Sequence, residues 1–240
     1  MYKKNVGLIG TGKWGKILEE KLKKNSNLIF SANSKFNYLK KIKKVNWVFV
    51  ATPDKTHYKI VKKLLFLRKN VFCEKPLTLN YKKSKFLFDL AKKQKVYLYV
   101  DDIQMYHHKK INFLKKNLII RKKLGQGKAI DLLYRFAYHD FYYLSRFIKN
   151  KKIKSINIKD KKFDLKFDII FNTNDVCKFD YSLRSKIKIH KINNINLITK
   201  KDLLTKMIKK VLNYNVDFNK NMEISLLSNK LIDKVFDRIK

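Results

Sequence analysis

Several features are scarce in this sequence of 240 residues, which has two cysteines, two prolines, six glycines and no apolar stretch long enough to cross a membrane. Cys73 and Cys177 lie far apart and outside any Cys-x-x-Cys motif, which argues against a disulfide framework or a zinc site and fits a reducing compartment. The first apolar segment begins almost at Met1, which leaves no room for a signal peptide. We therefore expect a cytoplasmic protein with no metal site and no membrane partner.

Acidic residues are also scarce, because 19 Asp and Glu face 58 Lys and Arg and give a formal net charge of +39. Such a charge is typical of nucleic-acid-binding proteins. Only six of the basic residues are arginine, however, and arginine makes most of the bidentate contacts to bases. The lysines are spread along the whole chain together with many Asn and Ile, the residues that A/T-rich codons encode. We attribute the charge mainly to genome composition, expect no specific nucleic-acid partner, and consider attraction of anionic substrates a second benefit.

Four of the six glycines are concentrated within residues 7–15, after a short apolar segment and before an amphipathic one. The main part of this run is Gly10-Thr11-Gly12-Lys13-Trp14-Gly15. The first glycine of that run allows a tight turn, the second allows a pyrophosphate to approach the backbone, and the third allows close packing of the following helix. The N-terminal amides of that helix would face the phosphates. The run therefore predicts a dinucleotide-binding turn.

The sequence also bears on which cofactor this turn holds. NAD-binding turns usually have an acidic residue about 20 residues after the glycines, bonded to the ribose hydroxyls. No acidic residue occurs from Lys21 to Pro53, and the expected position is occupied by Asn33, Ser34 and Lys35. These residues can hold a ribose or a 2′-phosphate, and the charge of Lys35 favours the phosphate. The sequence therefore favours NADP and leaves NAD open.

The first hundred residues alternate between strand-like and helix-like segments, which predicts a doubly wound parallel sheet. Both prolines, Pro53 and Pro76, follow expected strands and so lie at the carboxyl edge, where such sheets bind ligands. Strands are expected at 5–10, 27–31, 46–51, 70–74 and 96–100. Helices are expected at 13–24, 35–43, 55–68 and 80–93.

After about residue 101 the pattern changes to that of an α+β domain with a mostly antiparallel sheet. Helices are expected at 106–119, 139–149, 200–213 and 220–239. Strands are expected at 128–134, 153–159, 164–171, 176–182 and 186–190. We therefore divide the chain into a Rossmann domain at 1–101 and a smaller domain at 102–240 for substrate binding or oligomerisation, whose last helix can pack back on the first domain.

Three motifs, in order along the chain, resemble those of the glucose–fructose oxidoreductase, inositol dehydrogenase and rhizopine-catabolism (Gfo/Idh/MocA) family. The first is the glycine run. The second is Val50-Ala51-Thr52-Pro53 followed by His57, which resembles the family's A-T-P-x-x-x-H element. The third is Val71-Phe72-Cys73-Glu74-Lys75-Pro76, which resembles its V-x-x-E-K-P element. A weaker likeness runs through His139-Asp140 into the last helix.

The resemblance implies an NAD(P)-dependent oxidoreductase that acts on a CH–OH group of a sugar, cyclitol or nucleotide-sugar, for example in surface polysaccharide biosynthesis, and that forms a homo-oligomer. It implies that Lys75 stabilises the developing alkoxide and that His139 moves the hydroxyl proton. It implies a cis bond before Pro76. The implied cofactor groove includes Ala51, Thr52, Pro53, His57, Glu74, Lys75 and Pro76. The implied substrate site includes Lys75, Arg135, His139 and Asp140.

Two departures from the family pattern leave alternatives open. Arg135 stands four residues before His139, where many relatives have an aspartate, and its charge would lower the pKa of the histidine. The second domain is also shorter than is usual for the family. A catalytically impaired dinucleotide-binding protein of the same fold is therefore one alternative, and a nucleic-acid-binding protein is a lesser one. Glu74 has its own alternative, as a salt-bridge partner.

Overall fold

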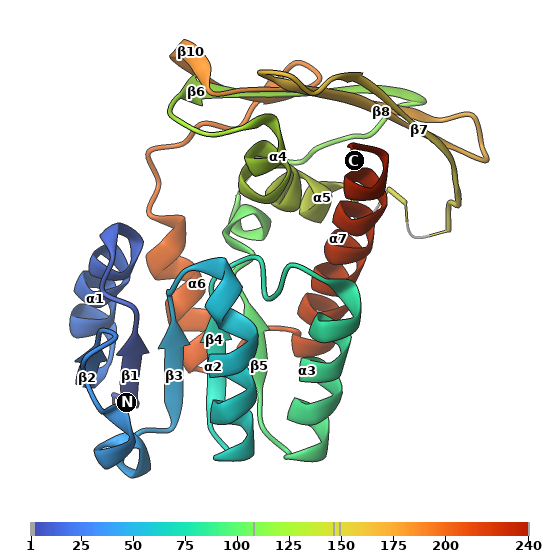
Figure 1. Ribbon diagram of the computed structural model, residues 1–240. Coiled ribbons are helices and arrows are strands. Elements are labelled where there is room, and N and C mark those ends of the chain that lie inside the picture. The colour runs from blue at the N-terminus through green and yellow to red at the C-terminus, as the bar shows by residue number, and fades with distance from the viewer. Residues whose placement is uncertain (1–2, 108, 146, 149, 240) are drawn as a thin grey trace. The chain divides into compact units, whose positions relative to one another are not determined.

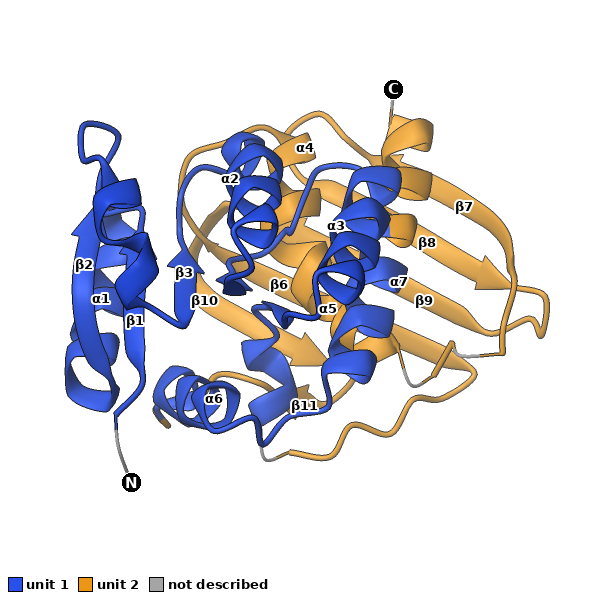
Figure 2. Ribbon diagram, turned by 90° about the horizontal axis from the view of Figure 1, so that it is seen from below, with its two compact units in different colours: residues 1–106, 202–229 blue, residues 107–201, 230–240 orange. Residues whose placement is uncertain are grey.

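The computed structural model of the chain describes residues 3–107, 109–145, 147–148 and 150–239. It divides into two compact units, coloured separately in Figure 2. The first unit comprises residues 1–106 and 202–229, and the second comprises residues 107–201 and 230–240. No helix in the described part of the chain combines the length and the apolar character that crossing a membrane requires.

The first unit is built on a sheet of five parallel strands in the order β2-β1-β3-β4-β5, which confirms the predicted Rossmann-like fold (Figure 1). Its strands are β1 (Asn5–Ile9), β2 (Asn27–Ala32), β3 (Trp47–Val50), β4 (Asn70–Cys73) and β5 (Leu98–Val100). All four residues of β3 are buried, because a central parallel strand is covered on both faces. Their side chains alternate between two hydrophobic clusters, with Val48 and Val50 in one and Trp47 and Phe49 in the other.

Helices cover both faces of this sheet. One face is covered by α2 (Asp54–Phe66) and α3 (Tyr81–Lys93), and the other by α1 (Lys13–Asn25) and α6 (Leu203–Leu212). The helix α6 packs here through Leu204, Met207, Ile208 and Val211, which is why residues far along the chain belong to the first unit. The last helix, α7 (Phe218–Ile239), begins in the first unit and ends in the second.

One helix expected in this unit is absent. Instead of a helix at 35–43, the structure has two short 3-10 turns, η1 (Tyr38–Lys40) and η2 (Ile42–Lys44). The side chain of Asn37 accepts a hydrogen bond from the amide of Leu39 at 3.2 Å, and such local bonds compete with a regular helix.

The second unit contains a six-stranded sheet in the order β11-β10-β6-β9-β8-β7. The pair β6–β9 is parallel and the other pairs are antiparallel, so the prediction of a mostly antiparallel sheet is confirmed. Its strands are β6 (Lys116–Leu124), β7 (Ile153–Asp160), β8 (Leu165–Phe171), β9 (Val176–Ser182), β10 (Arg184–Ile192) and β11 (Ile195–Asn196). Its short helices are α4 (Ala129–Leu132), the π turn η4 (Leu133–Ala137) and α5 (Tyr138–Leu144).

Two expectations for this unit were wrong. The segment 106–119 is not a helix, because η3 (Ile103–Tyr106) ends where it should begin and β6 starts at Lys116. The side chain of Asn117 accepts from the amide of Leu114 at 2.8 Å and donates to its carbonyl at 2.6 Å, which holds this chain in a loop. The segment 128–134 is helical rather than extended, because the carboxylate of Asp131 accepts from the amide of Lys128 at 2.8 Å and caps α4.

The expected helix at 139–149 corresponds to the shorter α5, and residues 146 and 149 lie outside the described part of the chain.

Candidate functional site

The glycine run forms a crowded turn between β1 and α1. Gly10 has a φ of 107°, and a Cβ there would lie 2.3 Å from the carbonyl oxygen of Ala51. A Cβ at Gly15 would lie 2.0 Å from the carbonyl oxygen of Gly10, so these two glycines are required by the protein's own packing. A Cβ at Gly12, by contrast, would meet no protein atom within 4 Å. Gly12 therefore leaves the backbone open to a ligand rather than to another part of the chain.

A pocket of about 750 Å³ opens beside this turn at the carboxyl edge of the sheet. The predicted cofactor residues on its wall are Gly10, Thr11, Gly12, Lys13, Trp14, Asn33, Ser34, Ala51, Thr52 and Pro53. Residues on its wall that the sequence argument missed are Ile9, Ala32, Phe36, Tyr38, Thr56 and Ile60. Of these, Thr56 was within reach of sequence reasoning, since it lies one helical turn after Thr52 and its hydroxyl bonds the Thr52 hydroxyl at 2.7 Å. The crowded turn and the pocket fit a dinucleotide.

The segment expected to hold the ribose end is exposed beside this pocket. Asn33 accepts a hydrogen bond from the amide of Lys35 at 3.0 Å and so forms a local turn. Asn33 and Ser34 belong to the pocket wall, whereas Lys35 is exposed next to it. Within the pocket wall, Phe36 and Tyr38 both stack on Phe30, which supplies an aromatic side to this end.

His57 is not among the residues of the pocket wall. Its side chain is fully buried, and its two ring nitrogens lie 2.8 Å from the carbonyl oxygens of Pro76 and Thr52. It thus bridges the segment after β3 to the segment after β4. His57 supports the carboxyl edge from behind, including the Lys75–Pro76 peptide bond, which is cis.

The residues that follow β4 include a buried carboxyl whose pKa is strongly shifted. Lys75 is half-buried and Glu74 is buried. Glu74 accepts a hydrogen bond from the indole of Trp14, so the glycine turn is joined directly to the end of β4. Burial, followed by the charge of Asp101, raises the pKa of Glu74 well above its ordinary value.

Asp101 and Asp102 are functional candidates that the sequence argument passed over. They follow β5 directly and are 2% and 6% exposed, so two carboxyls are buried at the ligand-binding edge. Burial raises the pKa of Asp102 to about 7, and its carboxyl is held by the hydroxyl of Tyr99 and by the amide of Asn221. The signal was present in the sequence, because a strand end at this edge is where ligand contacts are expected.

The remaining predicted site residues, Arg135, His139 and Asp140, lie in the second unit. The guanidinium of Arg135 donates to the carbonyl of Gln126 at 2.7 Å from the exposed side of η4. The π turn η4 precedes His139, so the four-residue spacing does not have regular α-helical geometry there. His139 is 9% exposed.

The side chain of Asp140 is fully buried. Its carboxylate lies 2.8 Å from Nε2 of His190 and 3.5 Å from Nη1 of Arg121. Burial alone would raise the pKa of Asp140, but the charges of His190 and Arg121 outweigh that effect and hold it below its ordinary value. Asp140 therefore stabilises the packing of α5 against the sheet.

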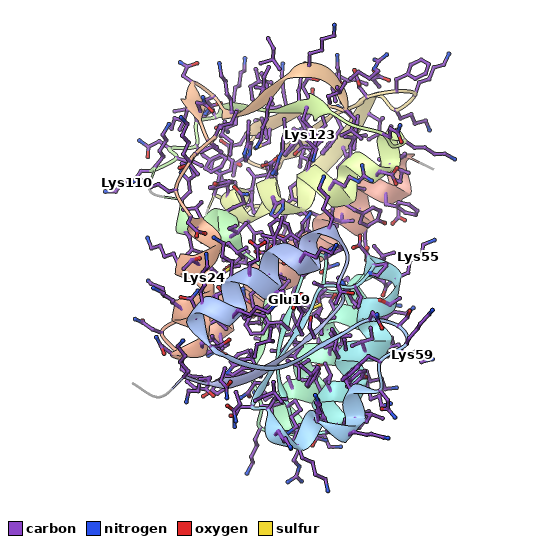
Figure 3. All side chains as sticks on the ribbon, turned by 90° about the vertical axis from the view of Figure 1, so that its left-hand side faces the viewer. Glu19, Lys24, Lys55, Lys59, Lys110 and Lys123 are labelled. Atoms are coloured by element: carbon purple, nitrogen blue, oxygen red, sulfur yellow. The ribbon has the colours of Figure 1, made fainter. Side chains whose placement is uncertain are left out.

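The basic side chains are dispersed over the molecule (Figure 3). Lysines project from helices and strands of both units, for example Lys24 from α1, Lys55 and Lys59 from α2, and Lys123 from β6. This distribution matches the scatter of lysine along the sequence.

Residues 17–102 match the model of the GFO_IDH_MocA family, described as an oxidoreductase family with an NAD-binding Rossmann fold. Residues 17–102 of the first unit are therefore similar to the NAD-binding domain of this family. The match agrees with the resemblance carried by the A-T-P motif and the E-K-P motif, which lie within it, whereas the glycine run lies before the matched residues.

Two curated relatives that match parts of this chain are described as uncharacterized oxidoreductases. One from Schizosaccharomyces pombe is 41% identical over 56 residues, which cover 23% of this chain and 15% of the relative. One from Streptococcus pneumoniae serotype 4 is 28% identical over 146 residues, which cover 53% of this chain and 38% of the relative. The matched regions thus span well under half the length of both relatives.

Among solved structures, the fold is similar to that of UDP-N-acetylglucosamine 3-dehydrogenase GnnA from Acidithiobacillus ferrooxidans. The TM-score is 0.83 at 14% sequence identity, with 100% of each chain covered. At this identity the likeness extends to the fold, and it includes the second unit, which the family model does not reach.

Proposed function

We propose that the protein transfers a hydride between NADP or NAD and a ring hydroxyl or ketone of a sugar, cyclitol or nucleotide-sugar. The observation that carries this proposal is the pairing of an open Gly12 backbone with a pocket of about 750 Å³ at the carboxyl edge of the sheet, where Lys75 lies two residues after the end of β4. A nicotinamide ring, when bound, supplies the hydride acceptor or donor. The chain supplies binding, orientation and charge.

Different pocket residues would bind different parts of the cofactor. The amides of Thr11 to Trp14, at the start of α1, would hold the pyrophosphate through their N–H groups and the positive end of the helix dipole. Asn33, Ser34 and Lys35 would hold the ribose end, and the absence of an acid from Lys21 to Pro53 supports a 2′-phosphate there. We therefore propose NADP as the preferred cofactor.

Lys75 is the residue we assign to the reacting oxygen. Its ammonium group follows β4 and would stabilise the negative charge that grows on the oxygen as the C–H bond breaks. His139, in the second unit, is the candidate for taking up the hydroxyl proton. A protein without turnover is the second candidate function, and the exposed Arg135 in place of an aspartate favours it.

A nucleotide-sugar is the substrate class that we favour. A solved structure of similar fold is a UDP-N-acetylglucosamine dehydrogenase, and a net charge of +39 would attract a diphosphate. We further propose that such a step serves surface polysaccharide assembly and that the enzyme is a homo-oligomer.

The test is a panel of nucleotide-sugars and free sugars assayed with each cofactor, in both directions, by nicotinamide absorbance. The proposal predicts turnover with at least one nucleotide-sugar, and it predicts that Lys75→Met lowers this turnover by about 10²- to 10³-fold without weakening cofactor binding. Binding of cofactor without turnover across the panel would favour the second candidate.

A further inference from the structure

Glu74 and Asp101 form a buried pair of carboxyls at the ligand-binding edge. In the register of β4 and β5, Cys73 is opposite Val100, so the residues that follow these strands lie side by side. The exposed fractions of the two side chains are 8% and 2%, and their carboxyls hydrogen-bond each other. We call these two residues the carboxyl pair.

A hydrogen bond between two carboxyls requires a proton, since two carboxylates only repel. Burial is the main cause that raises the pKa of each member of the carboxyl pair, and in Glu74 the charge of Asp101 raises it further. The two groups therefore titrate as one unit. Over a range of pH above the ordinary carboxyl values, this unit holds one proton and one negative charge.

The carboxyl pair is connected to both parts of the proposed active site. The indole of Trp14, which stands on the cofactor pocket wall, donates to Glu74. Lys75 is the next residue in the chain, and its charge lowers the pKa of both members of the pair. On its far side, Asp101 accepts from the amide of Ile103 at 2.8 Å.

Other titratable groups surround the carboxyl pair. Cys73 has its pKa raised by burial, then by the charges of Glu74 and Asp54 among others, so it stays a neutral thiol. Asp102 lies beyond the pair and is held separately by Tyr99 and Asn221. No group of three potential metal-ligating side chains is found in the described ranges.

We infer that the carboxyl pair positions Lys75. The pair shares one proton and keeps a single negative charge beside the Lys75 ammonium. It also connects Lys75 to the cofactor turn through Trp14. The importance of Lys75 rests on the proposed function. Proton sharing and the contact with Trp14 do not depend on turnover, and they can be measured without it.

Trp14 reports on the pair directly, because the chain has only two tryptophans. In a Trp47→Phe background, Trp14 is the sole tryptophan. If that background is unstable, the same signal is obtained by subtracting the spectrum of Trp14→Phe from that of the unaltered protein. We expect its emission to change with pH at a midpoint above the ordinary carboxyl value of about 4. Glu74→Gln should remove the change, because the amide can accept from the indole and donate to Asp101 without titrating.

Three further variants separate the pair from its surroundings. Asp102→Asn, which removes a neighbouring buried acid, should leave the midpoint in place. Asp101→Asn should lower the midpoint, because an amide donates to Glu74 without competing for its proton. If Glu74→Gln does not fold, Asp101→Asn serves as the test in its place. Lys75→Met should raise the midpoint, because the ammonium that lowers the pKa of both carboxyls is gone.

A midpoint near 4, or a titration that survives Glu74→Gln, would overturn the shared proton. A midpoint that is unchanged in Lys75→Met would overturn the link to Lys75. Failure of the proposed function looks different, because the protein would then show the Trp14 titration but no cofactor binding and no turnover.

Discussion

Buried acidic side chains occur in both units, and their pKa values are shifted in opposite directions. In the first unit, Glu74 faces another carboxyl, and burial raises its pKa well above the ordinary value. In the second unit, Asp140 is buried more deeply, at 0% exposed against 8% for Glu74, but His190 and Arg121 overcome the effect of burial and lower its pKa. The nearest partner, not the depth of burial, decides whether a buried acid is charged.

The difference distinguishes the carboxyl pair, which lies at a ligand-binding edge, from Asp140, which has a structural role. The carboxyl pair stands at the carboxyl edge of a parallel sheet, beside a pocket and a half-buried lysine, where a shared proton can be adjusted by a ligand. Asp140 has two cationic partners inside the second unit, and its charge is used to hold α5 on the sheet. Substitutions in the first group should change binding and rate, whereas substitutions in the second should change stability.

The largest effect is expected at Lys75. Lys75→Met should lower kcat by about 10²- to 10³-fold, because a charge that stabilises the reacting oxygen is lost. The melting temperature and the cofactor Kd should stay close to those of the unaltered protein, as thermal unfolding and cofactor titration can check. Full activity in this variant would remove Lys75 from the mechanism.

Asp140→Ala should have the largest effect on stability. It leaves the half-buried Arg121 and the buried His190 without their carboxylate and should lower the free energy of unfolding by about 3–5 kcal/mol. In a chain of this size, that corresponds to a fall of about 10 °C in the melting temperature. Asp89→Ala, which removes an exposed partner of Lys85, is the control and should cost less than about 1 kcal/mol. A stable but inactive Asp140→Ala protein would contradict this structural role.

Gly12→Ala should affect binding alone. A methyl group at this position meets no protein atom within 4 Å, so folding should be little changed. It would stand where the pyrophosphate approaches, and cofactor affinity should fall about tenfold, or about 1.4 kcal/mol. Gly15→Ala is the contrasting variant, because its methyl group would lie 2.0 Å from the carbonyl oxygen of Gly10 and should destabilise the fold as well. Equal behaviour of the two variants would argue against an open ligand position at Gly12.

The pH dependence of stability should differ in sign between the two units. The folded pKa of Glu74 is raised, so the folded state holds its proton more tightly and stability should fall as pH rises from the ordinary carboxyl value through the folded pKa. The folded pKa of Asp140 is lowered, so its contribution is present above the ordinary value and is lost as pH falls through the folded pKa. Denaturant unfolding at several pH values should show that Glu74→Gln flattens the first slope and Asp140→Asn flattens the second. Identical pH profiles for the two variants would contradict the opposite pKa shifts of Glu74 and Asp140.

The sequence was informative about the first unit because its signals are local. Each strand of the parallel sheet is a short apolar run, and glycine or proline marks the turns beside the pocket. The glycine run predicted the sheet edge at which the pocket lies, and the resemblance carried by the E-K-P motif agrees with the family model that matches residues 17–102. The failed helix at 35–43 depended on a side-chain bond of Asn37, which a periodicity argument cannot weigh against propensity.

The errors in the second unit involve local side-chain bonds, at Asn117 and Asp131, and also contacts between residues distant in the sequence. The strand β6 is defined by pairing with β9 and β10, whose residues lie about 60 to 70 positions later, and its own lysine-rich sequence has no clear period. The carboxyl pair was missed for the same reason. Glu74 and Asp101 are 27 positions apart, and only the register of β4 and β5 brings them together.

The binding of a nicotinamide dinucleotide at the glycine turn is tested most directly by titrating the purified protein with NADPH and with NADH at physiological salt. The fluorescence of the cofactor follows the titration. The account predicts saturable binding of at least one cofactor, tighter for NADPH because of Lys35 and the missing acid, and weakened in Gly12→Ala. No binding of either cofactor would contradict it, and it would leave the glycine turn as a scaffold without its ligand.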